Sequence, residues 1–199
     1  MTKITYFFAT TSPYTYLAGL RLEKIAVKHR ACVEYRPMDL TSVFSRTGGV
    51  LPKDRHISRI EMRAQELERQ AKKLNMPCNL KPSYFPVNMA PSSYAFISAS
   101  RHGDGDPGAL AFGFTRAVWA ENKDISNPKV ISQCLEAAGF DGALADKNML
   151  GAAEQYSKNT EEAVASGVFG APFYMTDTDQ RFWGQDRLED LDLILSGAL

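Results

Sequence analysis

The first forty residues constrain the fold more than any other part of the chain. Residues 4–8 are β-branched and aromatic and predict a strand, and residues 33–38 predict a second one. Between them, Ser12 and Pro13 have the residue types of a helix N-cap and a first helical position, so a helix is expected from Pro13 to about His29. A strand, a helix and a strand in this order favour a parallel pair joined by a right-handed crossover. The pattern therefore predicts the α/β class.

The middle of the chain predicts helices only. Apolar residues recur at steps of three and four through residues 57–74, which is the pattern of a long amphipathic helix. Further segments of helical composition follow at about 92–102, 107–121, 128–138 and 146–166. Near the end, residues 168–175 and 181–183 predict a hairpin, and a last helix is expected at about 186–195.

This order of elements predicts a thioredoxin-like fold with an all-helical insertion after the second strand. We assign residues 1–45 and 165–199 to the thioredoxin-like domain and residues 46–164 to the inserted helical domain. Because the two parts of the sheet must meet in space, the insertion is expected to be compact and hinged near residues 41–56 and 158–167.

Composition argues against several classes of function. The 23 basic residues balance the 23 acidic ones, so no overall field favours a nucleic acid or an anionic membrane as partner. No apolar stretch is long enough to span a membrane, and the apolar run at the N-terminus is too short for a signal peptide, so a cytoplasmic location is expected. The cysteines and histidines are scattered, without the spacing of a metal site or of a redox pair: Cys32, Cys78, Cys134, His29, His56 and His102. We expect no bound metal.

Ser12 is the first candidate for chemistry. Backbone N–H groups converge at the start of a helix, where the helix dipole also favours a negative charge such as a thiolate. Ser12 and Thr15 have the spacing of a redox Cys-x-x-Cys motif, with oxygen in place of both sulfurs. The chain cannot exchange disulfides there, but the Ser12 hydroxyl could donate to the thiolate of a bound ligand. The alternative is that Ser12 is only a helix cap.

Two segments near the C-terminus are further candidates. Pro172 opens a strand, and a strained or cis bond before it would expose the backbone of Ala171 to an extended peptide such as glutathione. The alternative is an ordinary proline at a sheet edge. Gln185 and Asp186 begin the last helix and could bind the γ-glutamyl end of glutathione, with Asp186 meeting its ammonium group. Alternatively, Asp186 caps the helix and Arg187 pairs on the surface.

Taken together and in order, these motifs resemble the 2-hydroxychromene-2-carboxylate isomerase family, which is related to kappa-class glutathione transferases and to DsbA-type oxidoreductases. The resemblance spans nearly the whole chain and rests on five segments: Phe8-Ala-Thr-Thr-Ser-Pro-Tyr-Thr-Tyr-Leu-Ala18, Thr47-Gly-Gly-Val-Leu-Pro52, Val118-Trp-Ala-Glu-Asn-Lys-Asp-Ile125, Val168-Phe-Gly-Ala-Pro172 and Phe182-Trp-Gly-Gln-Asp-Arg-Leu188.

The resemblance implies a homodimer that binds glutathione as a cofactor, with the glutathione sulfur at Ser12 as the catalytic position. It also implies that the cysteinyl backbone pairs with Ala171 before a cis Pro172. The γ-glutamyl part would then reach the turn formed by Trp183, Gly184, Gln185 and Asp186. Members of the family convert a bicyclic hydroxychromene carboxylate into an open-chain benzylidene pyruvate during degradation of aromatic compounds. Addition of a thiolate to a conjugated carbon, bond rotation and elimination account for this isomerisation.

The resemblance also suggests residues that contact a small aromatic acid as substrate. Phe44 stands where some members have a basic residue, and Asp54 and Arg55 stand where they have Asn-Arg. Arg55 could hold the substrate carboxylate in a bidentate manner, and Tyr84 could provide a hydroxyl or stacking contact. The alternative is that Arg55 only flanks the solvated start of a helix.

Two other functions fit the same motifs. A kappa-like glutathione transferase would use the same thiolate at Ser12 but would consume glutathione by joining it to an electrophile. A non-catalytic thioredoxin-like protein would only bind extended peptides beside Pro172. Catalysis by the cysteines of the chain itself is disfavoured, because neither position 12 nor position 15 is a cysteine.

Overall fold

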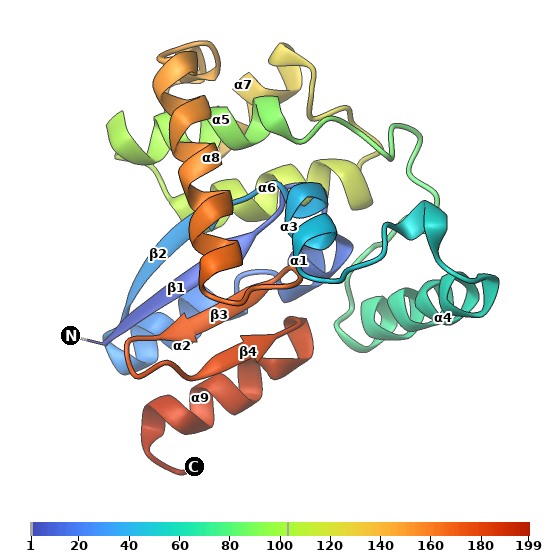
Figure 1. The fold of residues 1–199 in the computed structure, drawn as a ribbon. Coiled ribbons are helices and arrows are strands. Elements are labelled where there is room, and N and C mark those ends of the chain that lie inside the picture. Colours follow the sequence, from blue (N-terminus) through green and yellow to red (C-terminus); the bar gives the residue numbers. More distant parts are fainter. Residues whose placement is uncertain (1, 103) are drawn as a thin grey trace.

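The computed structural model describes residues 2–102 and 104–199, and its centre is a four-stranded sheet in the order β2-β1-β3-β4. Strands β1 (Lys3–Phe8) and β2 (Cys32–Pro37) are parallel, as the sequence predicts. Strands β3 (Phe173–Thr176) and β4 (Arg181–Trp183) form the antiparallel hairpin, and β3 also pairs antiparallel with β1. The chain thus returns to the sheet after its long helical segment (Figure 1).

The first crossover differs from the prediction of one helix over residues 13–29. It consists of α1 (Pro13–Ala18) and α2 (Arg21–His29), with a break at Gly19. Gly19 has a φ of +58° and a ψ of −136°, a conformation that no L-residue adopts easily and that cannot continue a helix. The break at Gly19 therefore lets α1 and α2 run in different directions. Helix α1 packs against α6 and α4, whereas α2 packs against α9.

The helical segment contains the predicted helices with small shifts of their ends: α4 (Ile57–Lys73), α5 (Ala90–His102), α6 (Pro107–Trp119), α7 (Pro128–Ala137) and α8 (Met149–Ala165). Three shorter helices were not predicted: α3 (Leu40–Arg46), η1 (Pro52–Asp54) and η2 (Gly142–Ala145). Helix α3 begins at Asp39, whose carboxylate accepts from the backbone N–H groups of Thr41 and Ser42. Among the described residues, no helix has the length and apolarity needed to cross a bilayer.

The C-terminal elements are shorter than predicted. Strand β3 begins at Phe173 and not at residue 168, because Val168 donates its N–H to the Ala163 carbonyl and Pro172 has no N–H to offer a ladder. After β4, the single turn η3 (Gln185–Arg187) precedes α9 (Leu188–Ser196), so the last helix starts two residues later than predicted.

The two faces of β1 contact different cores. Ile4, Tyr6 and Phe8 point into the larger core, which continues into α6 through Phe114 and Trp119. The opposite face carries Phe7 into a smaller core with Val43 of α3 and Ala163 of α8. Figure 1 shows α8 crossing one face of the sheet, and α4 set apart at the side beyond α1. The division into two domains with boundaries near 45 and 165 stays a prediction.

The half-buried carboxyl group of Glu23 has one oxygen enclosed by the protein. Glu23 accepts a hydrogen bond from the Tyr35 hydroxyl at 2.8 Å, and its second oxygen has no partner among the described residues. Space for this side chain depends on Gly108, where a Cβ atom would lie 2.5 Å from Cγ of Glu23. Burial raises the pKa of Glu23, which favours the protonated, neutral form in the folded state.

We expect Glu23→Gln to gain stability relative to the wild type as the pH rises. Because the folded-state pKa of Glu23 is raised, the folded protein holds a proton that the unfolded chain releases, so wild-type stability falls as the pH rises above the carboxyl's unfolded value. The neutral amide removes this dependence and keeps the acceptor for Tyr35. Denaturant unfolding at pH 4 and pH 7 measures the effect, with the exposed Glu154→Gln as control. This account is contradicted if the free energies of unfolding of Glu23→Gln and wild type differ by the same amount at pH 4 and at pH 7.

Candidate active site

One cavity of about 830 Å³ collects most of the residues singled out in the sequence. Its walls come from the start of α1, from α3, η1 and α4, from residues 85–89 and from two segments at the end of the sheet, 170–171 and 183–187. Of the predicted residues, those that line it are Ser12, Phe44, Arg55, Ala171, Trp183, Gly184, Gln185 and Asp186. The site is therefore built from parts of the chain that lie far apart in sequence.

Three predicted residues lie outside this lining. Pro172 is buried behind Ala171, where its carbonyl accepts the Gly184 N–H at 3.0 Å. Asp54 is exposed on η1, and Tyr84 has 52% of its surface exposed without lining the cavity. Neither Asp54 nor Tyr84 faces the cavity in this conformation.

Ser12 joins the two halves of the sheet domain. It is 4% exposed and caps α1, where its Oγ accepts from the Thr15 N–H at 3.2 Å. The same hydroxyl donates to the Ala171 carbonyl at 3.3 Å, although the two residues are 159 positions apart. Pro13 at the first helical position leaves no N–H to satisfy there. The hydroxyl proton is thus held beside the converging N–H groups of the helix start.

Ala171 presents its backbone to the cavity. The Ala171–Pro172 peptide bond is cis, as the resemblance implies. The Ala171 carbonyl accepts from Ser12, while no group among residues 2–102 and 104–199 accepts from its N–H. An extended peptide passing Ser12 could therefore accept from this N–H.

The turn after β4 is shaped by two glycines. A Cβ at Gly170 would collide with the indole nitrogen of Trp183, so only glycine lets this ring lie against residue 170. Gly184 has a φ of +111° and a ψ of 156°, a region open essentially to glycine alone. A Cβ there would lie 2.5 Å from Oδ1 of Asp186. Asp186 is exposed at the cavity, and its carboxylate pairs with Arg187 at 3.1 Å.

The side chain of Gln185 is not free to bind a ligand, as the sequence suggested it would be. Its side chain is 3% exposed and already engaged, because the amide oxygen accepts from Arg21 and the amide nitrogen donates to Oε1 of Gln70 at 3.1 Å. This amide ties α2 and α4 to the turn after β4. A ligand at this turn would meet the backbone of Gln185 rather than a free amide.

Basic side chains form part of the wall of the cavity. They are Lys53, Arg55, Arg59, Arg63 and Arg187, against the acidic Glu66 and Asp186. Both acidic groups are paired, Glu66 with Arg69 at 2.6 Å and Asp186 with Arg187. The cavity is therefore positive although the chain as a whole has no net charge. The remaining lining is largely apolar and includes Phe44, Met62, Phe85 and Met89.

Arg55 and Phe44 lie together on this wall. The guanidinium carbon of Arg55 stands 5.7 Å from the centre of the Phe44 ring, and its Nε donates to the Val50 carbonyl at 2.9 Å. Sequence reasoning missed other lining residues, among them Tyr14 and Arg63. Arg63 falls at a polar position of the amphipathic pattern over residues 57–74. Its four-residue spacing from Arg59 was the signal that could have identified it, because residues four apart lie on one face of a helix.

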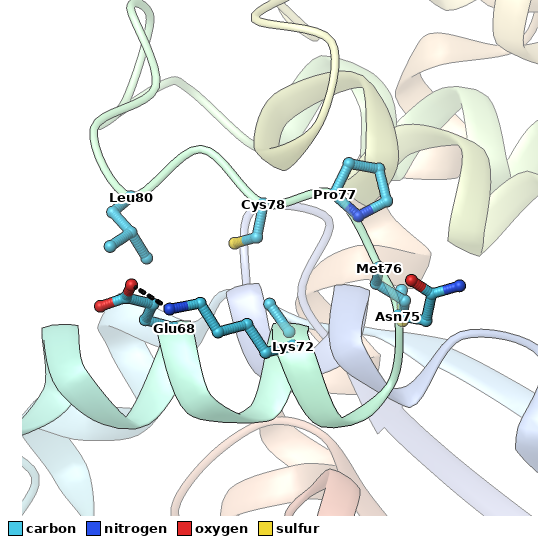
Figure 2. Close-up of a pocket in the computed structure, with 8 residues that line it drawn as sticks. Glu68, Lys72, Asn75, Met76, Pro77, Cys78 and Leu80 are labelled. Atoms are coloured by element: carbon cyan, nitrogen blue, oxygen red, sulfur yellow. Dashed lines mark hydrogen bonds and ion pairs between the residues drawn. The ribbon is translucent and has the colours of Figure 1, made fainter.

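A second cavity, of about 560 Å³, lies beside different residues of α4 (Figure 2). Glu68 and Lys72 form an ion pair of 2.7 Å on its floor, opposite Cys78 and Leu80. Burial raises the pKa of the Cys78 thiol, so this sulfur is not activated. None of the residues singled out as site candidates in the sequence lines this cavity, and we do not assign the active site to it.

Known proteins are similar to this chain over nearly its full length. The DSBA-like thioredoxin domain matches residues 3–196. A 2-hydroxychromene-2-carboxylate isomerase of Sphingobium xenophagum is 32% identical over 200 residues, which cover 98% of this chain and 99% of that protein. A second protein of that name, from Pseudomonas sp. strain C18, is 27% identical over 98% of this chain and 91% of its own length.

Solved structures show the same architecture. The structure of a 2-hydroxychromene-2-carboxylate isomerase superposes with a TM-score of 0.73 at 24% identity, over 98% of this chain and 95% of that chain. The cytosolic disulfide reductase DsbM from Pseudomonas aeruginosa with GSH superposes with a TM-score of 0.70 at 16% identity, over 98% of both chains. These structures confirm the predicted thioredoxin-like fold with a helical insertion.

We expect Gly184→Ala to lower the free energy of unfolding by about 1–3 kcal/mol, because alanine is strained at this φ and its Cβ meets Asp186. Gly48→Ala is the matched control, since Gly48 also has a positive φ of +77° but nothing lies within 4 Å of an added Cβ. The control should lose only about 1 kcal/mol. Denaturant unfolding compares the two variants. Equal losses would show that the turn at Gly184 adapts to a side chain.

Proposed function

Because the chain belongs to the DSBA-like thioredoxin domain family, we propose that its Ser12 cavity binds glutathione and that the protein is a glutathione-dependent isomerase of an aromatic or conjugated acid. The observation that carries this proposal is the position of the Ser12 hydroxyl, at a helix start and beside the backbone of Ala171. Relatives that are named 2-hydroxychromene-2-carboxylate isomerases over nearly the full length of this chain support an isomerase function.

The residues of the cavity fit glutathione in three respects. The Ala171 N–H has no acceptor among the described residues, and the Ser12 hydroxyl bonds to the carbonyl of the same residue. A peptide-like ligand with a sulfur side chain requires such a backbone donor next to a group that stabilises the sulfur. At the turn after β4, Asp186 offers a carboxylate for the ammonium group of the ligand. The cationic wall suits the ligand's carboxylates. When bound, glutathione would supply a thiolate that adds reversibly to a conjugated carbon, so that the neighbouring double bond can rotate.

The side chains of this protein have defined tasks in such a reaction. Ser12 would turn its hydroxyl proton from the Ala171 carbonyl towards the sulfur of a bound thiolate and stabilise the negative charge there. The N–H groups at the start of α1 and the helix dipole act in the same direction. Since both Ser12 and Thr15 carry oxygen, neither position could form a disulfide with the ligand's sulfur.

The second substrate would occupy the apolar part of the cavity. Phe44 offers a ring for stacking, and Arg55 beside it contributes positive charge for a carboxylate. Asp54 and Tyr84 would contact this substrate only after a local rearrangement, since both lie outside the lining. We retain the homodimer and the cytoplasmic location as predictions.

Thiol accounting distinguishes the isomerase from a transferase that uses the same residues. During turnover of a conjugated acid, an isomerase leaves the concentration of free glutathione thiol unchanged, whereas a transferase consumes one thiol for each product. Loss of thiol in step with product formation would replace the isomerase proposal with the transferase. Failure of glutathione to bind at millimolar concentration in calorimetry would refute both and leave the peptide-binding function.

We expect Ser12→Ala to raise the pKa of the bound glutathione thiol by about one unit, because loss of a charge-assisted hydrogen bond disfavours the thiolate by roughly tenfold. The ultraviolet absorbance of the bound thiolate, followed against pH, measures this change. The fold should persist, with a loss of about 1 kcal/mol from the missing cap.

Asn127→Ala is the matched control for this experiment. Asn127 caps α7 with a hydrogen bond from the Lys129 N–H at 2.9 Å and lies away from the cavity. The control should lose similar stability without any shift in the thiol titration. If Ser12→Ala leaves the titration unchanged as well, Ser12 is only a helix cap.

A further inference from the structure

Arg63 is a half-buried cation in the active-site cavity without a counter-ion. It lies on α4 and lines the cavity. Within residues 2–102 and 104–199, its guanidinium takes part in no hydrogen bond or ion pair, and its defined contact is the face of the Trp119 ring at 6.0 Å. Burial lowers the pKa of Arg63, although the nearby Tyr14 opposes the shift. A partly desolvated guanidinium with all five donors unused is stabilised by an anion.

The other cations of the wall differ from Arg63 in this respect. Arg55 has its Nε committed to the Val50 carbonyl. Lys53 and Arg59 are exposed, so water satisfies their donors at little cost. Arg187 already pairs with Asp186 and with Asp190. Among the basic residues of the lining, Arg63 therefore gains most from a bound anion.

Trp119 connects Arg63 to the sulfur position. The indole is 1% exposed, and its N–H donates to the carbonyl of Thr11 at 3.1 Å. Thr11 directly precedes Ser12 in the chain. The same ring thus supports the guanidinium on its face and the Ser12 loop at its edge. Trp119 therefore contacts both the guanidinium of Arg63 and the residue that precedes Ser12.

We propose that Arg63, supported by Trp119, binds the carboxylate of the second substrate and makes the enzyme select acids over neutral compounds of the same shape. This inference rests on the proposed function for the reaction that the bound acid undergoes. The anion site itself does not depend on that function. The geometry suits a planar conjugated acid, because its carboxylate would lie at Arg63 while its conjugated carbons extend across the apolar lining towards Ser12. Arg55 would then contribute to the charge of the wall without being the main anchor.

The test compares trans-cinnamate with cinnamamide, which has nearly the same shape and no charge. Dissociation constants are measured by ligand-observed NMR titration, with and without glutathione. We expect the wild type to prefer the acid over the amide, and Arg63→Met to weaken cinnamate binding about tenfold or more while cinnamamide is unaffected. Arg63→Lys should recover part of the preference, because it restores the charge without the planar fork.

Two further variants make the result specific. Lys72→Met removes a cation from the same helix that pairs with Glu68, and neither residue lines the active-site cavity, so it should leave both dissociation constants unchanged. Arg55→Met should weaken cinnamate binding less than Arg63→Met does. The proposal is overturned if wild type binds acid and amide equally or neither at all, or if Arg63→Met weakens both alike. It is also overturned if Arg55→Met causes the larger selective loss.

The experiment separates this inference from the proposed function. Glutathione binding to the wild type is titrated on its own by calorimetry. If the protein binds cinnamate through Arg63 but does not bind glutathione, the anion site stands and the proposed isomerase function is refuted. If the protein binds glutathione but does not prefer the acid, the proposed cofactor stands and the proposed role of Arg63 is refuted.

Discussion

The site depends on the antiparallel pairing of β1 with β3. These strands come from opposite ends of the chain, and their register places Tyr6 opposite Tyr174 and Phe7 opposite Phe173. The start of α1 follows β1 directly, and Ala171 comes shortly before β3, so this register determines which residue faces Ser12. The bond from Ser12 to the Ala171 carbonyl is a consequence of strand pairing. A shift by one residue would turn every side chain of β3 to the other face and remove Ala171 from the cavity.

The cavity also needs α4, which packs against α1 and contributes Leu67 and Ala71 to the larger core. Gln185 adds a polar connection, because its one amide joins Arg21 on α2 and Gln70 on α4. Buried amides with both ends satisfied fix a geometry more strictly than apolar contacts do. The turn proposed to face glutathione and the helix that carries Arg63 are therefore joined through the same residue. Loss of this amide would disturb both ends of the cavity together.

The sequence predicted the parts of this protein that depend on local chemistry. Ser12 and Pro13 specify a helix start by themselves, and Pro172 specifies a strand start, so both were found without the structure. The break at Gly19 was missed because a glycine inside a helical pattern is often tolerated. Arg63 was missed because an amphipathic pattern separates polar from apolar positions but cannot say whether the polar face meets water or a cavity. The position of Asp54 and Tyr84 outside the lining depends on how residues 47–56 and 77–89 pack, which no periodicity encodes.

The charges of the cavity suggest why a serine can replace the cysteine of a redox site. A redox enzyme must release its partner after exchange, whereas this cavity would hold two anionic ligands at once, a thiolate and an acid. Two negative charges in one desolvated space repel each other strongly unless each has its own donor. The structure offers two separate anchors, the helix start at Ser12 and the guanidinium of Arg63, with the Trp119 ring between them. Each anchor is formed in the folded protein before any ligand arrives, so the reorganisation needed on binding is small. In the proposed reaction, the separation of the two anchors, rather than the strength of either, would determine which conjugated acids bring a carbon within reach of the sulfur.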